Sequence, residues 1–344
     1  MQNLWKNALD TLSPYISNLF DNDVVCINNE RYRIQKLLGE GGFAFVYLVQ
    51  NVSNEKLYAL KKIKCSFGNK GIKKAMKEAD YHRKFKSNYL LKSYTHQLVK
   101  EADGSEFVYI LFPYFAKGSV AQVIRNCDIE GSYISEKRIL VWCSCLCKAL
   151  QYLHENVAGD SPKQPEVNDL IMFDEPQVPQ NTSNNNLVSY IHGDIKPDNL
   201  LLHENSREIV LTDFGSICLV PIFASNNSEA IAIQDKASEN CTMPFRAPEL
   251  FHVKAGSTIT EKADIWSFGC TLYTIMFHAS PFEREVSQGG SLALAVCNAQ
   301  YSFPRKHPYS TLLCEIVEAC LQREPNKRPS ARELLSKIDL QINQ

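Results

Sequence analysis

The chain has 344 residues, of which 44% are hydrophobic and 22% are charged, and its formal net charge is −1. This length can bury a large core in one catalytic unit or in two ordinary domains. The balanced charge argues against binding to nucleic acid through bulk electrostatics, so we expect no nucleic-acid partner. The 12 cysteines are scattered and form no Cys-x-x-Cys pair, which argues against zinc sites and predicts a reduced compartment such as the cytoplasm.

The first 30 residues are predicted to be an extension ahead of the folded unit. Apolar residues recur at helical spacing over residues 3–13, so this stretch is expected to form a short amphipathic helix before Pro14. Its polar face is poorly suited to bind anionic lipid, because the positive charge of Lys6 is offset by the negative charge of Asp10. Packing against the folded unit is the alternative role of this helix.

A glycine-rich turn follows, between two apolar and β-prone runs. Glycine amides can lie close to phosphate oxygens because no Cβ obstructs them, so the turn is a candidate nucleotide-binding lid. A dinucleotide-binding fold is the alternative, but it needs a helix after the glycines, and residues 45–50 are typical of a strand. The predicted lid over ATP consists of Leu38, Gly39, Glu40, Gly41, Gly42, Phe43, Ala44, Phe45 and Val46.

A lysine at the end of the next strand-like run, residues 58–61, is the candidate ligand of the α- and β-phosphates. Lys61 would need a carboxylate to hold it. Residues 72–85 are predicted to form a helix, and Glu78 lies within it. A solvated helix residue is the alternative for Glu78, but the combination with Lys61 favours an ion pair.

The middle of the chain combines a predicted helix with a long insertion. Residues 135–155 have a helical pattern, and the three cysteines at 143, 145 and 147 are expected to be buried small hydrophobes. The segment 157–187 is rich in proline and asparagine and is predicted to be disordered. A tolerated surface insertion is the simpler interpretation. The alternative is a docking site carried by the apolar residues 170–173.

The most informative segment covers residues 190–200, and an Asp-Phe-Gly tripeptide beginning at Asp213 follows it. Phosphoryl transfer requires the protein mainly to position a nucleophile and to neutralise phosphate charge. Asp194 is predicted to orient the incoming hydroxyl, and Lys196 to reach the γ-phosphate. Asn199 and Asp213 are oxygen ligands suited to Mg²⁺. Each motif alone also fits a surface turn, but their order and spacing favour phosphoryl transfer.

These motifs together resemble the eukaryotic protein kinase superfamily, from about residue 32 to residue 339. The Ala-Pro-Glu sequence that ends at Glu249 is similar to the end of the activation segment. Residues 264–269 resemble the buried helix that anchors the catalytic loop, and Arg328 stands where the family's arginine pairs with the glutamate.

The resemblance implies an α+β, bilobal fold with ATP between the lobes. Residues 31–115 would form a small antiparallel-sheet lobe with one helix, and residues 116–344 a larger, mainly helical lobe. The adenine pocket would have apolar walls, while backbone groups read the edge of the base. Its residues would be Val46, Ala59, Leu201, Pro113, Tyr114 and Phe115.

The resemblance also bears on regulation and on the acceptor. Thr242 stands where serine/threonine-type kinases place a threonine, so we expect protein substrates with serine or threonine acceptors. Gly193 replaces an arginine that binds a phosphorylated activation loop in many kinases. Activity is therefore expected not to require phosphorylation of residues 216–246. Whether part of this segment forms an extra helix, as in some relatives, stays open.

A narrower resemblance is to the Numb-associated kinases, and within them to the myristoylated and palmitoylated serine/threonine kinases and their fungal relatives. It is carried by residues 39–46, 77–83, 111–115 and 241–251. This group implies a role in membrane trafficking or in signalling at the Golgi or vacuole. Gln2 stands where the acylation motif requires glycine, so peripheral membrane association is expected to use a route other than N-myristoylation.

A catalytically weak kinase-fold scaffold is the alternative function. Such chains usually lose the phosphate-binding lysine, the catalytic aspartate or the metal-binding aspartate. Lys61, Asp194 and Asp213 are all present, so the sequence favours an active ATP-dependent protein serine/threonine kinase.

Overall fold

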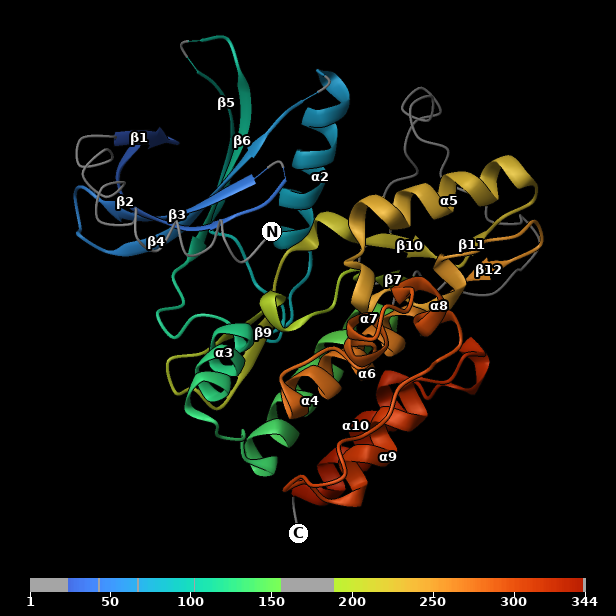
Figure 1. The fold of residues 1–344 in the computed structure, drawn as a ribbon. Helices are drawn as coiled ribbons and strands as arrows, with labels where there is room; N and C mark the ends of the chain where they lie inside the picture. Colours follow the sequence, from blue (N-terminus) through green and yellow to red (C-terminus); the bar gives the residue numbers. More distant parts are fainter. Residues whose placement is uncertain (1–23, 43, 67, 102, 156–188, 343–344) are drawn as a thin grey trace. The chain divides into compact units, whose positions relative to one another are not determined.

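The computed structural model describes residues 24–42, 44–66, 68–101, 103–155 and 189–342. The helix predicted over residues 3–13, the insertion predicted at 157–187 and Phe43 lie outside these ranges. The chain divides into two compact units, one comprising residues 1–86 and 91–116 and the other residues 87–90 and 117–344. The first is built on an antiparallel sheet and the second is mainly helical (Figure 1), so the predicted α+β fold is confirmed.

A six-stranded antiparallel sheet forms the first unit, in the order β1-β2-β3-β4-β6-β5. The strands predicted over residues 45–50 and 58–61 are confirmed as parts of β3 and β4. One strand, β1, falls within the predicted extension of residues 1–30, so part of this extension belongs to the sheet. The strands are β1 (Val24–Ile27), β2 (Glu30–Glu40), β3 (Ala44–Asn51), β4 (Leu57–Lys64), β5 (Thr95–Lys100) and β6 (Glu106–Pro113).

The two edges of this sheet meet. Asn28 and Asn29 connect β1 to β2 with φ angles of 48° and 69°, the left-handed conformation that a tight two-residue hairpin requires and asparagine tolerates. The Asn28 amide donates to Oε1 of Gln97 at 2.8 Å, and its side chain donates to the Thr95 hydroxyl. Since β5 is the opposite edge strand, the sheet curls until the β1–β2 turn contacts side chains of β5, although the described strands β1 and β5 form no ladder with each other.

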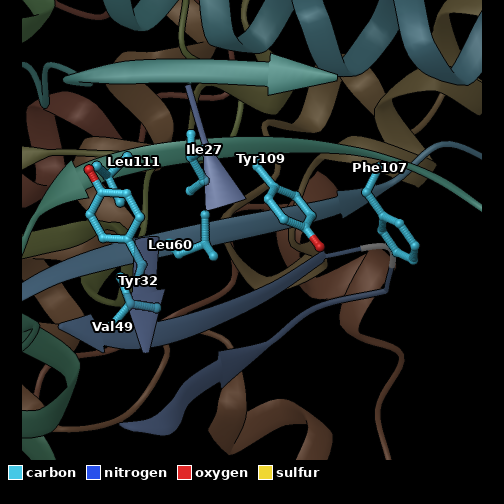
Figure 2. Close-up of a cluster of buried hydrophobic side chains, with 7 residues drawn as sticks. All are labelled: Ile27, Tyr32, Val49, Leu60, Phe107, Tyr109 and Leu111. Atoms are coloured by element: carbon cyan, nitrogen blue, oxygen red, sulfur yellow. The ribbon is translucent and has the colours of Figure 1, made fainter. Parts of the chain in front are cut away.

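Apolar residues on one face of the curled sheet form the core of the first unit (Figure 2). Side chains alternate between the faces of a strand, which places Leu111 on this face and Phe112 on the other. The helix α2 (Asn69–Lys84) covers the other face, where His82 packs edge-on against Phe112 with ring centroids 4.7 Å apart. The core cluster comprises Ile27, Tyr32, Val49, Leu60, Phe107, Tyr109 and Leu111.

In its described residues, the second unit is mainly helical and contains three small two-stranded sheets. Its helices are α3 (Val120–Glu130), α4 (Glu136–His154), α5 (Asn227–Asn240), α6 (Lys262–Phe277), α7 (Glu283–Ser287), α8 (Leu292–Cys297), α9 (Thr311–Cys320) and α10 (Ala331–Ile342). Its strands are β7 (Ser189–Ile191), β8 (Leu200–Leu202), β9 (Ile209–Leu211), β10 (Cys218–Val220), β11 (Ile222–Phe223) and β12 (Thr258–Ile259). Its short 3₁₀ helices are η2 (Pro197–Asn199), η3 (Phe214–Ser216), η4 (Met243–Phe245), η5 (Pro248–Leu250) and η6 (Pro325–Lys327).

Two buried helices form the centre of the second unit. The predicted helix of residues 135–155 is confirmed as α4, which packs against α10 and α6. The cysteines at 143, 145 and 147 are buried as expected; burial raises the pKa of the Cys147 thiol, which keeps it protonated and unreactive. Helix α6 is buried along nearly its whole length. Among the described residues, no helix combines the length and apolar composition needed to cross a bilayer.

Candidate active site

The glycine-rich turn connects β2 and β3 as a hairpin. Gly39 pairs with Val46, Glu40 pairs with Phe45, and the Gly41 amide donates to the carbonyl of Ala44 at 2.7 Å. A strand rather than a helix follows the glycines, which excludes the dinucleotide-binding alternative. A Cβ added at Gly39 or Gly42 would meet no described atom within 4 Å. Packing within the described chain therefore does not require glycine at these positions. Glycine would instead allow a phosphate to approach the backbone closely.

Strand register brings the predicted nucleotide-binding side chains of the first unit to one face of the sheet. Val46 lies opposite Lys61, and Ala59 lies opposite Phe112. Directly paired residues share a face, and residues two apart along a strand share it too. Val46, Ala59 and Lys61 therefore lie on the face that α2 covers. Pro113 ends β6, and Tyr114 and Phe115 follow it.

The expected ion pair between the sheet and the helix is present. Lys61 on β4 places its Nζ 2.7 Å from Oε1 of Glu78 on α2, and the two side chains are 15% and 9% exposed. Desolvation strengthens such a pair but makes the loss of one partner costly. The pair therefore holds the Lys61 ammonium at one position beside Val46 and Ala59.

In the second unit, a short hairpin brings the two predicted metal ligands to the same end of the β8–β9 ladder. Leu200 pairs with Leu211, and the ladder continues where the Thr212 amide donates to the carbonyl of Asn199 at 3.0 Å. Thr212 therefore faces Asn199, and Asp213 is the next residue along the chain. Leu201, the predicted adenine contact from this unit, lies in the middle of β8 and is half-buried.

Asp194 is the centre of a hydrogen-bond network in the second unit. Its Oδ2 lies 2.7 Å from Nζ of Lys196, and its Oδ1 accepts from the Thr242 amide at 2.9 Å. The Lys196 ammonium also donates to the Thr242 hydroxyl at 2.7 Å. Asn199 donates through Nδ2 to the backbone carbonyl of Asp194 at 2.8 Å. The carboxylate of Asp194 thus has one orientation, fixed by a cation and by the backbone of the activation segment.

A buried carboxylate on α6 holds the loop that carries Asp194. Asp264 is fully buried and accepts from the amides of His192 and Gly193 at 2.8 and 3.0 Å and from Nε2 of His154 at 3.0 Å. Burial alone would raise the pKa of Asp264, but the hydrogen bond and charge of His154 and the backbone donors outweigh it, so this pKa is lowered. The stabilisation is therefore present above the ordinary carboxyl range and is lost as pH falls through the lowered pKa.

The Asp-Phe-Gly tripeptide has a defined but uncommon backbone. Asp213 has φ 67° and ψ 79°, a left-handed conformation that costs energy for any residue other than glycine and often occurs at functional sites. The ring of Phe214 is buried and meets the His192 ring edge-on at 6.0 Å. The packing of Phe214 therefore fixes the backbone that presents Asp213.

Gly193 has a structural role beyond the absence of an arginine. Its φ is 81°, and an added Cβ would lie 3.0 Å from the Ser216 carbonyl oxygen and 3.3 Å from the Ser216 Cβ. A side chain would be strained here and would press on the start of the activation segment. The structure therefore gives a steric reason for glycine at the position where many kinases have arginine.

The activation segment contains more regular structure than its residues indicate. Strand β10 pairs with β7, β11 pairs with β12, and α5 forms an extra helix over Asn227–Asn240. The sequence does not show whether part of the activation segment forms an extra helix, and the structure shows that it does. No sequence motif indicates the role of Arg246, which is buried and donates to the carbonyl of Cys241 at 3.0 Å.

The predicted pair at the end of the activation segment is present. Arg328 binds Glu249 through two parallel contacts of 2.7 and 2.8 Å. The guanidinium also donates to the backbone carbonyls of residues 322, 323 and 262 and lies over the ring of Trp266 at 5.1 Å. All five of its N–H donors are therefore used.

The donor set of the second unit fits a hard divalent cation. The Nδ2 of Asn199 is bound to the backbone of Asp194, which turns its carbonyl oxygen away from that contact, and Asp213 supplies a carboxylate. Within the described ranges, no group of three or more His, Cys, Asp or Glu side chains could enclose a metal by itself. Two oxygen ligands fit Mg²⁺, which completes its shell with water and substrate phosphate.

The structure thus brings the predicted residues together in two sets. Lys61 and Glu78 pair in the first unit, and Asp194, Lys196 and Asn199 form one network in the second. That both sets act on one nucleotide stays a prediction.

Comparison with known proteins agrees with this chemistry. The family described as "Protein kinase domain" matches residues 32–158 and 186–338. The chain is 34% identical to "Serine/threonine-protein kinase ENV7" of Saccharomyces cerevisiae, with 92% of this chain and 93% of the yeast protein covered. It is 32% identical to "Serine/threonine-protein kinase 16" of Rattus norvegicus and 31% identical to the Homo sapiens protein of that name, with 92% of each chain covered.

Proposed function

Because the chain belongs to the protein kinase family, we propose that its two sets of site residues transfer the γ-phosphate of ATP to serine and threonine hydroxyls of protein substrates. Its yeast and mammalian relatives are serine/threonine-protein kinases by name, and the chain is an ATP-dependent kinase of this class. The observation that carries the proposal is the Asp194 network, in which a lysine and the Thr242 backbone fix the carboxylate.

Each residue of the second unit has a proposed task. Asp194 accepts the hydrogen bond of the acceptor hydroxyl and orients its oxygen toward the phosphorus. Lys196 lies 2.7 Å from this carboxylate and donates to the oxygens of the transferring phosphoryl group. Asn199 and Asp213 hold Mg²⁺, which supplies charge neutralisation at the phosphates when it is bound.

The first unit is proposed to bind the nucleotide. The Lys61 ammonium, held by Glu78, binds the α- and β-phosphates, while the glycine-rich hairpin places its amides over the phosphate chain. Val46 and Ala59, together with Leu201 of the second unit, contact the faces of the adenine. The carbonyl of Pro113 and the amide of Phe115 read its edge.

The test of this function is Mg²⁺-dependent transfer of labelled phosphate from ATP to a generic protein acceptor. We expect transfer by the wild-type chain, and none above background by Lys61→Arg or Asp194→Ala. Omission of Mg²⁺ should abolish the signal. Equal inactivity of the wild type and both variants would instead support the alternative of a kinase-fold scaffold.

The ion pair of the first unit makes a separate prediction. Glu78→Gln removes the charge that holds Lys61 while keeping the shape of the side chain, so the ammonium is expected to leave its position. A misplacement of about 1 Å can cost about 100-fold in rate, and we expect a fall of that order in kcat/KM for ATP. Asp80→Asn, at an exposed position on the same helix, is the matched control and should change the rate less than about twofold.

Activity should not depend on phosphorylation of the activation segment. Gly193 offers no cation to a phosphate there, and its φ of 81° disfavours any side chain. We expect the phosphatase-treated wild-type chain to retain its initial rate within about twofold, because no arginine at position 193 has to be engaged. An inactive dephosphorylated preparation that recovers with ATP would contradict this prediction.

We also propose that the chain is cytoplasmic and that it associates peripherally with an anionic membrane such as that of the Golgi or vacuole. What supports this is a lysine stripe on one side of α2, which has no acidic residue in its first turn. Like charges three and four residues apart and cations near a helix N-terminus both destabilise a helix. Where a sequence departs from these helix preferences, the departure often marks a functional surface such as a binding site. The stripe comprises Lys70, Lys73, Lys74, Lys77 and Lys84.

Flotation with vesicles tests the lysine stripe. Each lysine near an anionic surface contributes about 1 kcal/mol, so we expect the chain to float with phosphatidylserine vesicles and not with phosphatidylcholine vesicles. Lys73→Glu/Lys74→Glu should abolish flotation, whereas Arg305→Glu/Lys306→Glu, an exposed pair in the second unit, should not. Loss of flotation only on deletion of residues 1–20 would place the contact in the N-terminal extension instead.

A further inference from the structure

The buried arginine of the activation segment, Arg246, has no counter-charge among the described residues. The residue is 5% exposed, and within the described part of the chain its hydrogen-bond acceptors are all neutral: the hydroxyl and carbonyl of Ser238 at 3.2 and 3.3 Å and the carbonyl of Cys241 at 3.0 Å. No atom of the described residues accepts a hydrogen bond from its Nε. The other side of the guanidinium faces the ring of Phe251 at 5.0 Å. A buried cation without an anion is costly.

A second buried arginine in the same unit has the carboxylate partner that Arg246 lacks among the described residues. Arg328 is equally buried, but it has the carboxylate of Glu249 at 2.7 Å and uses all five donors. The N–H donors of Arg246 could bind an anion. The side-chain oxygen that now lies beside them is the hydroxyl of Ser238.

Ser238 is placed so that an anion attached to it would reach this cation. It lies in the last turn of α5 and is exposed, yet its Oγ is 3.2 Å from Nη1 of Arg246. One side of the hydroxyl therefore contacts the guanidinium while the residue remains accessible to solvent. A phosphate on this oxygen would place three acceptor oxygens beside a buried and unpaired cation.

The helix that carries Ser238 is only lightly attached. Of the side chains of α5, only Ala230 and Ala237 are buried, so little apolar area holds the helix against the unit. Helix ends with few buried contacts open locally at small cost. The Ser238 hydroxyl can therefore reach the active site of a modifying enzyme by fraying of the last turn.

We propose that Ser238 is a phosphorylation site and that Arg246 binds its phosphate. A bond forms between Oγ of Ser238 and the γ-phosphorus of ATP, and the bond from that phosphorus to the β–γ bridging oxygen breaks. The hydroxyl proton passes to solvent, and ADP leaves. Any ATP-dependent protein kinase can supply the phosphoryl group, so this inference does not depend on the activity of the chain itself.

The phosphate would tie α5 to the segment that reaches Asp194. Arg246 also donates to the carbonyl of Cys241, and the next residue, Thr242, contacts both Asp194 and Lys196. The helix C-terminus and the neighbouring Glu239 oppose a negative charge, but Glu239 is exposed and screened by solvent. The direct contact with a buried guanidinium is the stronger interaction.

The test installs phosphoserine at position 238 of the full chain by genetic code expansion and follows its ³¹P signal against pH. Phosphoserine ordinarily has a second pKa of about 6, and a guanidinium in contact should lower it by about one pH unit or more. Arg246→Gln should return the pKa to about 6, and Arg246→Lys should keep part of the effect. Phosphoserine at Ser228, exposed in the first turn of α5, should not respond to either substitution.

Hydrogen exchange provides a second readout that does not require the arginine variants to fold. In the wild-type chain, phosphoserine at 238 should slow exchange of the amides in residues 230–241 about tenfold or more relative to the unmodified chain. A pKa of about 6 for phosphoserine 238 in the wild type, or unchanged or faster exchange, would overturn the proposal.

Discussion

Replacement of Asp194 by alanine is expected to lower kcat about 1000-fold, while KM for ATP changes only a few-fold. A positioned acid or base contributes about 10² to 10⁴ in rate, and a loss of about 1000-fold corresponds to about 4 kcal/mol of transition-state stabilisation. Nucleotide binding should be retained, because the proposed phosphate and adenine contacts come from other residues. Initial rates at saturating and limiting ATP, with a peptide acceptor, separate the two parameters.

Two further variants make this test specific. Asp194→Asn keeps the shape of the side chain and should be almost as inactive as alanine, because it loses the charge that pairs with Lys196 at 2.7 Å. Asp198→Asn is the matched control: it lies in the same loop but is exposed, and its kcat should stay within about twofold of the wild type. Comparable losses of kcat at both positions would show that a disturbance of the loop, rather than removal of the Asp194 carboxylate, causes the effect.

The residues of the proposed site could be predicted because their chemistry is tied to short motifs. A lysine at the end of a strand and a glutamate in the next helix predict an ion pair, and the structure has Lys61 and Glu78 at 2.7 Å. The spacing between Asn199 and Asp213 predicts a common function, and the β8–β9 hairpin accounts for it by register. In each case a local element connects the two residues, so sequence order carries the spatial information.

The anchor of the catalytic loop is a different case. His154 and Asp264 are 110 residues apart, and their contact depends on the packing of α4 against α6. Residues 264–269 could be recognised as a buried helix, but neither residue alone predicts the other as its partner. The steric requirement at Gly193 likewise depends on Ser216, which tertiary structure brings to it.

The sequence does not decide whether α5 forms, although it contains a local signal for the start of this helix. Its apolar pattern is weak, because only two alanines are buried, and periodicity therefore fails as an indicator. The N-terminus is clearer: Oδ1 of Asn226 accepts from the Glu229 amide at 3.0 Å, and Oε1 of Glu229 accepts from the Asn226 side chain at 2.8 Å. An asparagine followed three residues later by glutamate is a capping signature. The Asn28-Asn29 pair similarly signals the hairpin that adds β1 to the sheet.

The largest stability effect is expected at Arg328. Removal of one partner of a buried pair typically costs about 3–5 kcal/mol, because the remaining charge is left without compensation. The Arg328 side chain is fully buried, and Glu249 is 17% exposed, so Arg328→Ala should lower the free energy of unfolding of the second unit by about this amount. The urea midpoint of the full chain, followed by the fluorescence of Trp266 and the other tryptophans, measures the change.

A matched pair in the same unit distinguishes burial from charge. Arg332 and Glu155 also form a two-point contact, but Arg332 is exposed, and such pairs contribute about 0–1 kcal/mol; Arg332→Ala should therefore barely move the midpoint. If instead both alanine variants shift it equally, the burial argument fails. Replacement of both partners by Arg328→Met and Glu249→Leu should recover much of the loss, since hydrophobic substitutes for a buried pair are often neutral or stabilising. Recovery by this double variant would mean that the uncompensated Glu249 charge, rather than the lost attraction, accounts for most of the cost.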